Sequence, residues 1–220
     1  MGQMVEGLAA DYGCEVAGVI DPQSPKHGGG PDAPGWDGVD VAIDFSTAAS
    51  VPMNASALAR RGINLVVGTT GWSKDEATVR SAIEQSGTGI VVAPNFSTGV
   101  VVFDAIVAQA ARLFAQREDF GAYLHEIHHR AKVDAPSGTA QLLKRSMEAA
   151  GFPRPIDVSS SRVGFVPGTH TVGFDGPAET VTLTHAARDR SAFARGALLA
   201  AQWVQGKRGW FTMRDVLGIE

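Results

Sequence analysis

The first half of the chain alternates short apolar runs with helical patterns, and this alternation is the feature that most constrains the fold. Strands are predicted at residues 16–20, 39–45, 64–67 and 89–93, of which 16–20 is a continuous apolar run, and the helical patterns occupy residues 4–10, 50–61 and 73–86. Continuous apolar runs of this length are typical of strands buried on both faces of a parallel sheet. The repetition predicts an α/β fold with a Rossmann-like, doubly wound parallel sheet.

Two helix ends in this half carry local signals. Gly62 follows the helical pattern at residues 50–61 and fits the position just past a helix, where glycine adopts the left-handed conformation. Ser73 stands three residues before Glu76, and this spacing predicts a capping box at the start of the next helix.

The pattern changes after Phe96, where we expect the first domain to end. Helices are predicted at residues 100–116, 138–150 and 191–205, and strands at residues 122–127, 157–162, 170–174 and 179–185. Strands grouped beside helices are typical of an α+β domain. We therefore predict a dinucleotide-binding domain at residues 1–96 and a substrate-binding and oligomerisation domain at residues 97–190. The tail at residues 191–220 is expected to return to the first domain.

The composition narrows the class of protein. The 220 residues carry a formal net charge of −4, so nucleic acid is not an expected partner. No stretch reaches the ~20 unbroken apolar residues of a membrane helix, and residues 1–10 lack the pattern of a signal peptide. Cys14 is the only cysteine, which excludes disulfide frameworks and cysteine-rich zinc sites and favours a cytoplasmic location.

Polar and glycine-rich segments follow the predicted strands of the first half, and open α/β sheets bind ligands at the carboxyl ends of their strands. These segments are Asp21, residues 44–46, Gly68-Thr69-Thr70-Gly71 and Asn95-Phe96-Ser97. An acidic residue after the second strand can accept hydrogen bonds from both hydroxyls of an adenosine ribose, and its charge disfavours a 2′-phosphate. Asp21 therefore favours NADH over NADPH, although an Asp before Pro is also ordinary turn chemistry.

The phosphate-binding part of a dinucleotide site is incomplete in this sequence. Such a site needs a strand, a glycine-rich turn and a helix whose N-terminus faces the pyrophosphate. The helix is present and is headed by Gly2, in the place of the third glycine of the pattern, but the preceding strand and the other glycines are not. We expect a sheet without its first strand, and either a shortened start or a chain that does not bind its cofactor normally.

The densest group of chemically active residues lies at residues 126–140. It contains Glu126, His128, His129, Arg130, Lys132 and Asp134, followed by Ser137-Gly138-Thr139 at the start of a predicted helix. A helix N-terminus offers free N–H groups to a carboxylate, Lys132 can pair with that carboxylate, and a histidine can donate a proton near neutral pH. The segment fits an anionic substrate that is protonated as it accepts hydride.

Other interpretations of this segment stay open. His128 and His129 could form a metal-binding pair, but adjacent strand residues point to opposite faces and no third ligand stands at a recognisable spacing, so no metal is expected. Arg130 and Asp134 are also typical of a solvated loop, and Ser137 is also typical of a helix cap.

The segments at residues 126–140, 68–71 and 93–97 closely resemble those of the 4-hydroxy-tetrahydrodipicolinate reductases, also called dihydrodipicolinate reductases. The resemblance extends from Gly2 to the tail at residues 213–217. It implies a Rossmann domain joined by hinges to an α+β domain whose sheet usually builds a homotetramer. It also implies NAD(P)H-dependent reduction of 4-hydroxy-tetrahydrodipicolinate (dihydrodipicolinate) to tetrahydrodipicolinate in the diaminopimelate route to lysine.

The resemblance further implies residue roles. His128 matches the proton donor, and Lys132 matches a second catalytic residue that also holds a substrate carboxylate, while the cofactor delivers hydride to C4 of the ring. Substrate-binding positions are matched by His129, Gly138 and Thr139, to which we add Ser137 because it opens the same helix. Cofactor positions are matched by Gly2, Asp21, Gly68, Thr69, Thr70, Ala93, Pro94, Asn95 and Phe96.

Three departures from the family pattern qualify what the resemblance implies. The first strand and early glycines are absent, Ala131 stands where many relatives have a further histidine, and residues 163–170 lack a longer insert that feeds the oligomer sheet in many relatives. A homo-oligomer is expected, with its size left open. The alternatives are another NAD(P)-dependent dehydrogenase on the same scaffold and a truncated, non-catalytic paralogue.

Overall fold

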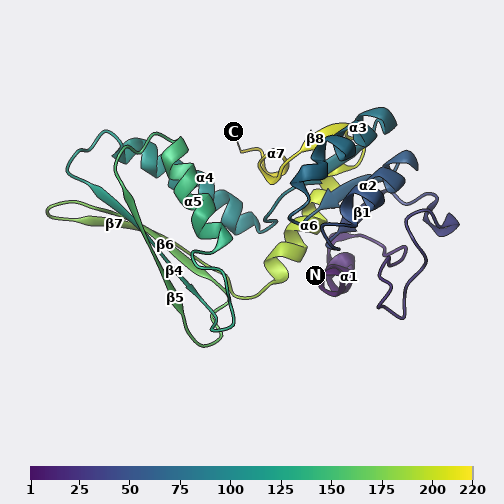
Figure 1. The fold of residues 1–220 in the computed structure, drawn as a ribbon, viewed down its shortest axis with the longest axis horizontal. Coiled ribbons are helices and arrows are strands. Elements are labelled where there is room, and N and C mark those ends of the chain that lie inside the picture. Colours follow the sequence, from purple (N-terminus) through teal and green to yellow (C-terminus); the bar gives the residue numbers. More distant parts are fainter. Residues whose placement is uncertain (220) are drawn as a thin grey trace. The chain divides into compact units, whose positions relative to one another are not determined.

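The chain forms two compact units in the computed structural model, which describes residues 1–219. Unit 1 consists of Met1–Thr98 together with the chain from Ser191 onward, and unit 2 consists of Gly99–Arg190 (Figure 1). Unit 2 is thus continuous in sequence, whereas unit 1 is assembled from two separate stretches.

Unit 1 is built on a parallel sheet that is covered on both faces. The strands β1 (Val41–Asp44), β2 (Asn64–Val67), β3 (Gly89–Val92) and β8 (Gly209–Phe211) lie in the order β1-β2-β3-β8. Leu65, Val67 and Ile90 share a core with the helices α2 (Val51–Arg60) and α3 (Glu76–Ser86). The alternate residues of these strands face the other side, where α6 (Ser191–Val204) contacts β1, β2 and β3. The predicted α/β, Rossmann-like class is confirmed.

The predicted strand at residues 16–20 is wrong. A single isolated bridge joins Val19 to His27, and within residues 1–219 no strand pairs with this segment. A strand needs a neighbour that satisfies its backbone N–H and C=O groups, and here the carbonyl of Val19 accepts instead from Gly28 in the following loop. The apolar run therefore stays irregular, and the sheet begins at β1.

The segment before β1 is held mainly by short turns. The helix α1 (Gly2–Leu8) continues into a 3-10 turn at Ala9–Tyr12 that ends at Gly13 with φ 62°. A second 3-10 turn at Pro34–Trp36 buries the Trp36 ring. Gly18 lies against this ring, because a Cβ at that position would stand 2.5 Å from it.

Of the two predicted helix ends, one is confirmed and one is wrong. Gly62 follows α2 with φ 78°, as predicted. Ser73 does not cap a helix, because a 3-10 turn at Ser73–Asp75 moves the start of α3 to Glu76, and no side chain caps that start. A capping box forms instead between Thr212 and Asp215, at the start of α7 (Met213–Leu217).

Unit 2 is a mixed sheet with helices on one face. The strands β4 (Gly121–His128), β5 (Ile156–Arg162), β6 (Thr169–Asp175) and β7 (Thr180–Ala186) lie in the order β5-β4-β6-β7. The pair β4–β5 is parallel, and the pairs β4–β6 and β6–β7 are antiparallel. The helices α4 (Thr98–Phe114) and α5 (Gly138–Ala149) pack on one face through a core that includes Phe103, Leu124, Leu143 and Phe174.

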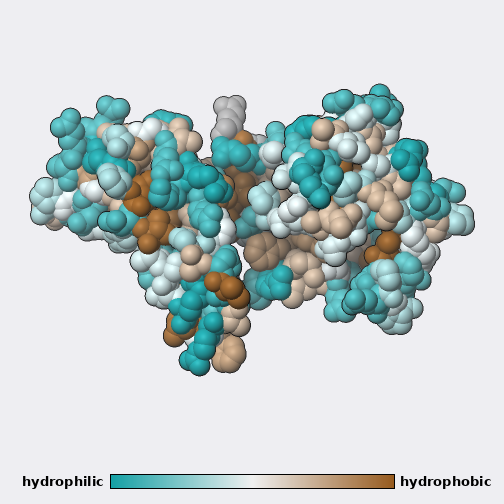
Figure 2. All heavy atoms as spheres, viewed as in Figure 1, coloured by the Kyte–Doolittle hydropathy of each residue, from teal (hydrophilic) through white to brown (hydrophobic). Residues whose placement is uncertain are grey.

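The helix α4 is long and apolar enough, by length and composition alone, to cross a membrane. Its residues Phe103, Val107 and Ala111 lie in the core of unit 2, whereas its residues Val102, Ile106 and Leu113 are exposed. Figure 2 shows hydrophilic, intermediate and apolar residues interspersed over the visible surface.

Candidate active site

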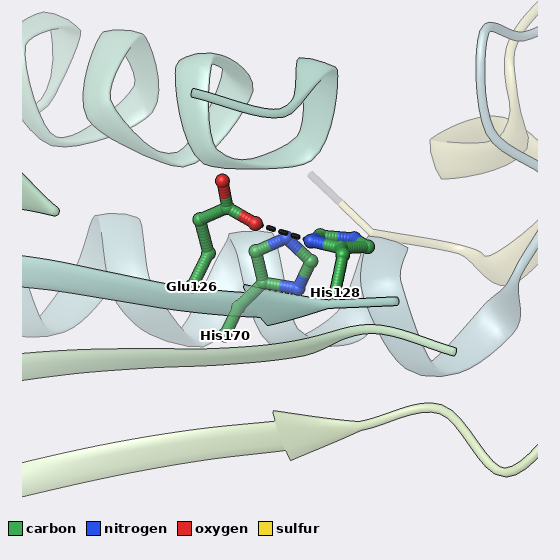
Figure 3. Close-up of side chains that lie close together, drawn as sticks. All are labelled: Glu126, His128 and His170. Carbon is green, nitrogen blue, oxygen red and sulfur yellow. Dashed lines mark hydrogen bonds and ion pairs between the residues drawn. The ribbon is translucent and has the colours of Figure 1, made fainter. Parts of the chain in front are cut away.

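The candidate site is centred on two buried residues of β4 that lie on the same face of the sheet. Glu126 and His128 are two positions apart, so both side chains point to the side covered by the helices, and Glu126 is fully buried. His128 Nδ1 and Glu126 Oε2 form a hydrogen bond. His170 of β6 pairs in register with Glu126, and its ring stands edge-on to that of His128, 5.1 Å between centroids (Figure 3).

The other oxygen of Glu126 binds two further parts of the chain. Oε1 accepts from Arg162 Nη2 at 2.7 Å and from the backbone N–H of Ser137 at 3.2 Å. Burial acts to raise the pKa of the Glu126 carboxyl, but hydrogen bonds from Arg162, Ser160 and His128 outweigh it and lower the pKa to about 2. Glu126 is therefore ionised at neutral pH and can only accept hydrogen bonds.

The state of Glu126 determines how His128 is protonated. An ionised carboxylate needs a donor, so Nδ1 of His128 carries a hydrogen and Nε2 is the nitrogen whose protonation changes. Burial lowers the pKa of His128, and the charges of Lys132 and Arg162 act in the same direction, while the bond to Glu126 opposes them. Gly168 packs against the His128 ring, because a Cβ there would lie 2.9 Å from Nε2.

Lys132 lies on the loop that follows β4 and forms an ion pair within that loop. Its Nζ donates to both carboxylate oxygens of Asp134, at 2.7 and 3.0 Å. The backbone carbonyl of Asp134 accepts from Arg162 Nη2 at 2.6 Å. Arg162 therefore joins the lysine loop to Glu126, and through Glu126 to His128.

The start of α5 completes this group. Ser137 is buried and caps the helix, because its Oγ accepts from the backbone N–H of Ala140 at 3.2 Å. The same Oγ lies 3.1 Å from His170 Nε2. Of the three predicted residues, Ser137 therefore serves as the helix cap. Gly138 is exposed and Thr139 is half-buried.

His129 is not part of the Glu126 network. It follows His128 directly and lines a separate cavity of about 420 Å³, together with Arg130, Ala131, Gly164 and Phe165. Neighbouring residues at a strand end point in different directions, which explains the separation of the two histidines.

Glu126, His128 and His170 are also close enough to be considered as metal ligands, with ligand atoms within 4.8 Å of one another. His170 is a third ligand that sequence spacing did not reveal, because it reaches Glu126 through strand pairing. A metal ion would have to replace the Glu126–His128 hydrogen bond and would lie near the guanidinium of Arg162. Burial lowers the pKa of His170 to about 4, so its ring is neutral, which is the form of histidine that either accepts a hydrogen bond or binds a metal. The contacts present are hydrogen bonds, between Glu126 and both His128 and Arg162 and between Ser137 and His170.

In unit 1, the predicted cofactor residues at the strand ends meet around the ring of Phe45. A Cβ on Gly68 would lie 2.1 Å from this ring, and Phe96 contacts it edge-on with centroids 6.1 Å apart. Thr69 Oγ1 donates to Asp44 Oδ1 at 2.8 Å. The turns after β2 and β3 thus pack around one aromatic ring, and the missing side chain of Gly68 lets the Phe45 ring lie against its backbone.

Further contacts fix the loop after β3. Asn95 Oδ1 accepts from the backbone N–H of Ser97 at 2.9 Å. Gly196 of α6 lies directly against the carbonyl of Phe96, since a Cβ there would be 1.7 Å from that oxygen. Ala93 and Phe96 are buried, and Pro94 is exposed. The loop is therefore held in the interior at both of these buried residues and exposes the residue Pro94 between them.

Gly2 and Asp21 belong to the segment before β1. Gly2 is the first residue of α1. Asp21 Oδ1 accepts from the backbone N–H of Gln23 at 2.9 Å, and the Asp21 N–H donates to His27 Nδ1 at 3.1 Å. The Asp21 side chain therefore stabilises a turn, which is the alternative role that the sequence offers for it.

Sequence reasoning missed Arg162 and His170 and assigned no role to Glu126. The spacing of Glu126 and His128 on a strand was a usable signal, because residues i and i+2 share a face. Arg162 and His170 reach the site through the register of β5 and β6 with β4, which the spacing of residues along the chain does not reveal.

Comparison with known proteins gives a consistent result. The sequence matches the family description "Dihydrodipicolinate reductase, N-terminus" over residues 1–96 and "Dihydrodipicolinate reductase, C-terminus" over residues 99–217. The 4-hydroxy-tetrahydrodipicolinate reductase of Christiangramia forsetii is 34% identical over 99% of this chain and 93% of its own length. The protein of the same name from Methanoregula boonei is 40% identical over 82% of this chain and 76% of its own.

Solved structures show the same fold. A dipicolinate-bound dihydrodipicolinate reductase from Paenisporosarcina sp. TG-14 has a TM-score of 0.68 at 24% identity, over 79% of this chain and 71% of that one. An amine dehydrogenase from Mycobacterium smegmatis has a TM-score of 0.57 at 12% identity, over 98% and 92% of the two chains. The sequence matches over both units and the identity to curated relatives show that this chain belongs to the dihydrodipicolinate reductase family of NAD(P)H-dependent oxidoreductases.

Proposed function

We propose that this chain catalyses the NAD(P)H-dependent reduction of 4-hydroxy-tetrahydrodipicolinate to tetrahydrodipicolinate, in the diaminopimelate route to lysine. The observation that carries the proposal is the position of His128, whose Nδ1 is held by ionised Glu126 at the end of the strand that leads to Lys132. Reduction of an anionic cyclic imine needs a proton donor and a cation for a carboxylate, and this segment supplies both.

His128 donates the proton from Nε2. Glu126 holds the opposite ring nitrogen, stabilises the protonated imidazole and fixes its orientation. A substrate with two carboxylates adds negative charge near the ring and so favours its protonated form against the effect of burial. A side chain at position 168 would crowd Nε2, since a Cβ there would lie 2.9 Å from it, so the glycine spares the donor nitrogen that contact.

Lys132 binds a carboxylate of the substrate. The backbone N–H groups of Gly138 and Thr139, at the first turn of α5, provide further donors at the positive end of the helix. Ser137 positions the start of this helix. Its Oγ caps the helix by accepting from the Ala140 N–H, and its own backbone N–H donates to Glu126. His129 is assigned to substrate binding by the family resemblance alone, because it lines the separate cavity with Arg130 and Phe165.

The residues that would hold the nicotinamide cofactor belong to unit 1. Gly68, Thr69 and Thr70 and the segment Ala93-Pro94-Asn95-Phe96 lie at the strand ends described above, with Gly2 for the pyrophosphate and Asp21 for the ribose. A reduced nicotinamide, when bound, would supply the hydride for C4 of the ring. The 4-hydroxyl group leaves as water, and the ring imine is kept in the product. The charge of Asp21 favours NADH over NADPH.

We place the protein in the cytoplasm as a homo-oligomer. Its one cysteine, Cys14, forms no disulfide, as suits a reducing compartment. The sheet of unit 2 supports the second part, because α4 and α5 pack on one face and leave the other, with Tyr123, Thr171 and Thr184, uncovered by helices among residues 99–190. Such a face can pair with the same face of a second copy.

Steady-state kinetics of NADH and NADPH oxidation with freshly generated substrate tests the proposal. We expect turnover by the wild-type chain with a higher kcat/KM for NADH, a kcat about 10²–10⁴-fold lower for His128→Ala, and a raised KM for Lys132→Ala. The matched control is Lys144→Ala, which replaces a lysine of α5 that pairs with Glu148. This variant should behave as wild type. Full turnover by both site variants contradicts the assigned roles, and absence of turnover in a folded wild-type chain favours a non-catalytic paralogue.

A further inference from the structure

The cation assigned to the substrate carboxylate already has a carboxylate bound to it. Lys132 Nζ lies 2.7 and 3.0 Å from the two carboxylate oxygens of Asp134. The Lys132 side chain is 22% exposed and that of Asp134 is 57% exposed. The pair is therefore reachable by a small anion from solvent.

The position of Asp134 is fixed by the same network that holds His128. Its backbone carbonyl accepts from Arg162 Nη2 at 2.6 Å, and the same nitrogen donates to Glu126 Oε1 at 2.7 Å. The Lys132 ion pair lowers the pKa of the Asp134 carboxyl, and the backbone N–H of Gly138 also contributes. The Asp134 carboxylate therefore interacts with both kinds of donor that the proposed function assigns to the substrate, the ammonium of Lys132 and the first amide of α5.

An aspartate carboxylate and a ring carboxylate of the substrate have the same charge and the same two-oxygen geometry. Lys132 offers three N–H donors from one point charge, and two of its contacts are already made with Asp134. Only one carboxylate can occupy that arrangement at a time.

We propose that Asp134 is an internal competitor that occupies the carboxylate position at Lys132 until the substrate displaces it. This inference rests on the proposed function, because it takes Lys132 as the substrate's cation. The exchange of one carboxylate for another keeps Lys132 ordered and paired in the empty enzyme. It also sets a threshold for other anions, because a free monocarboxylate has to compete with a tethered one at high effective concentration.

Asp134→Asn tests the inference, since the amide keeps the size of the side chain and removes its charge. We expect the KM for the dicarboxylate substrate to fall about two- to fivefold, the range set by a partly exposed ion pair. The dissociation constant of dipicolinate, measured by calorimetry, should fall by a similar factor. If either constant rises or stays unchanged, Asp134 holds Lys132 in its productive position or has no role, and the inference is overturned.

Asp157→Asn is the control for the change in net charge. Asp157 is an exposed residue of β5 and does not contact Lys132 in the structure, so both constants should match those of the wild type. An equal decrease in this variant would assign the effect to overall charge and would contradict the inference.

A crystal structure of the wild-type chain with dipicolinate gives a second, direct readout. We expect a ligand carboxylate on Lys132 Nζ and the Asp134 carboxylate withdrawn from it. An intact Lys132–Asp134 pair beside bound ligand overturns the inference. Calorimetry and crystallography need no turnover, so a failure of the proposed reaction stays distinguishable from a failure of the competition.

Discussion

At the scale of single residues, Glu126 is the side chain on which most of the candidate site depends. Its two oxygens contact His128, Arg162 and the backbone of Ser137. A buried carboxylate that lost one of these donors would lose much of what compensates its desolvation. The charge of Glu126 therefore has two effects, since it stabilises the fold locally and raises the pKa of the histidine beside it.

Glu126→Gln should change the pH dependence of the reaction as well as its rate. Burial already lowers the pKa of His128, and Glu126 opposes that decrease. Without the carboxylate the pKa of His128 is lower still, so the protonated donor is lost at a lower pH as pH rises. We expect the alkaline limb of kcat/KM to move to lower pH and kcat to fall about tenfold or more.

The control for this prediction is Glu148→Gln, which removes an exposed carboxylate that pairs with Lys144 on α5. Its pH profile should coincide with that of the wild type. A Glu126→Gln enzyme whose rate falls equally at every pH, with the limb unmoved, would show a purely structural role for this carboxylate.

At the scale of secondary structure, the start of α5 connects stability with the site. Ser137→Ala removes the acceptor for the Ala140 N–H and the partner of His170 Nε2. Loss of such a cap costs about 1 kcal/mol, and we expect a decrease in Tm of about 2–4 °C for a chain of this size. Thermal unfolding followed by circular dichroism measures it. Ser146→Ala, in the interior of the same helix, should leave Tm unchanged or slightly raised.

Most elements could be predicted from sequence because burial leaves a recognisable pattern of apolar residues. Burial on both faces leaves a continuous apolar run, and burial on one face leaves a periodic one. The segments that became β2 and β3 are largely apolar, and α5 begins directly after its cap, Ser137, as expected. The segment at residues 16–20 has the same apolar composition, but a strand also needs a partner, which composition does not report. Ser73 failed as a cap because the local 3-10 turn, and not the Ser–Glu spacing, set the helix start.

The candidate site was only partly predictable for a related reason. His128, Lys132 and Ser137 lie close together in sequence, so their clustering could be read directly from the segment. Arg162 and His170 come from strands that are 34 or more residues further along from His128 and join it only through the sheet register. Asp134 stands two residues after Lys132 in the sequence. The spacing alone does not show that both of its carboxylate oxygens accept hydrogen bonds from Lys132 Nζ.

At the scale of the whole molecule, the uncovered face of the unit 2 sheet is the surface proposed for self-association. Thr171 lies on the central strand β6, between His125 and Thr184, and its Oγ1 is 3.1 Å from that of Thr184. Thr171→Arg places a long cation in the middle of this face. We expect the oligomer to dissociate to a smaller species in sedimentation velocity, whereas Gln141→Arg, on the exposed side of α5, should not change the distribution.

The discontinuity of unit 1 has a consequence for how the protein is made. Unit 2 is contiguous, so the ribosome delivers all of it before α6 and β8, which cover and complete the parallel sheet of unit 1. Until those last stretches emerge, β3 lacks its outer partner and one apolar side of the sheet stays exposed to water. A nascent chain at this stage therefore contains all of unit 2 but only part of unit 1, whose sheet has an unpaired strand edge and an uncovered apolar face. We expect the chain to be most prone to aggregation or chaperone binding during this interval.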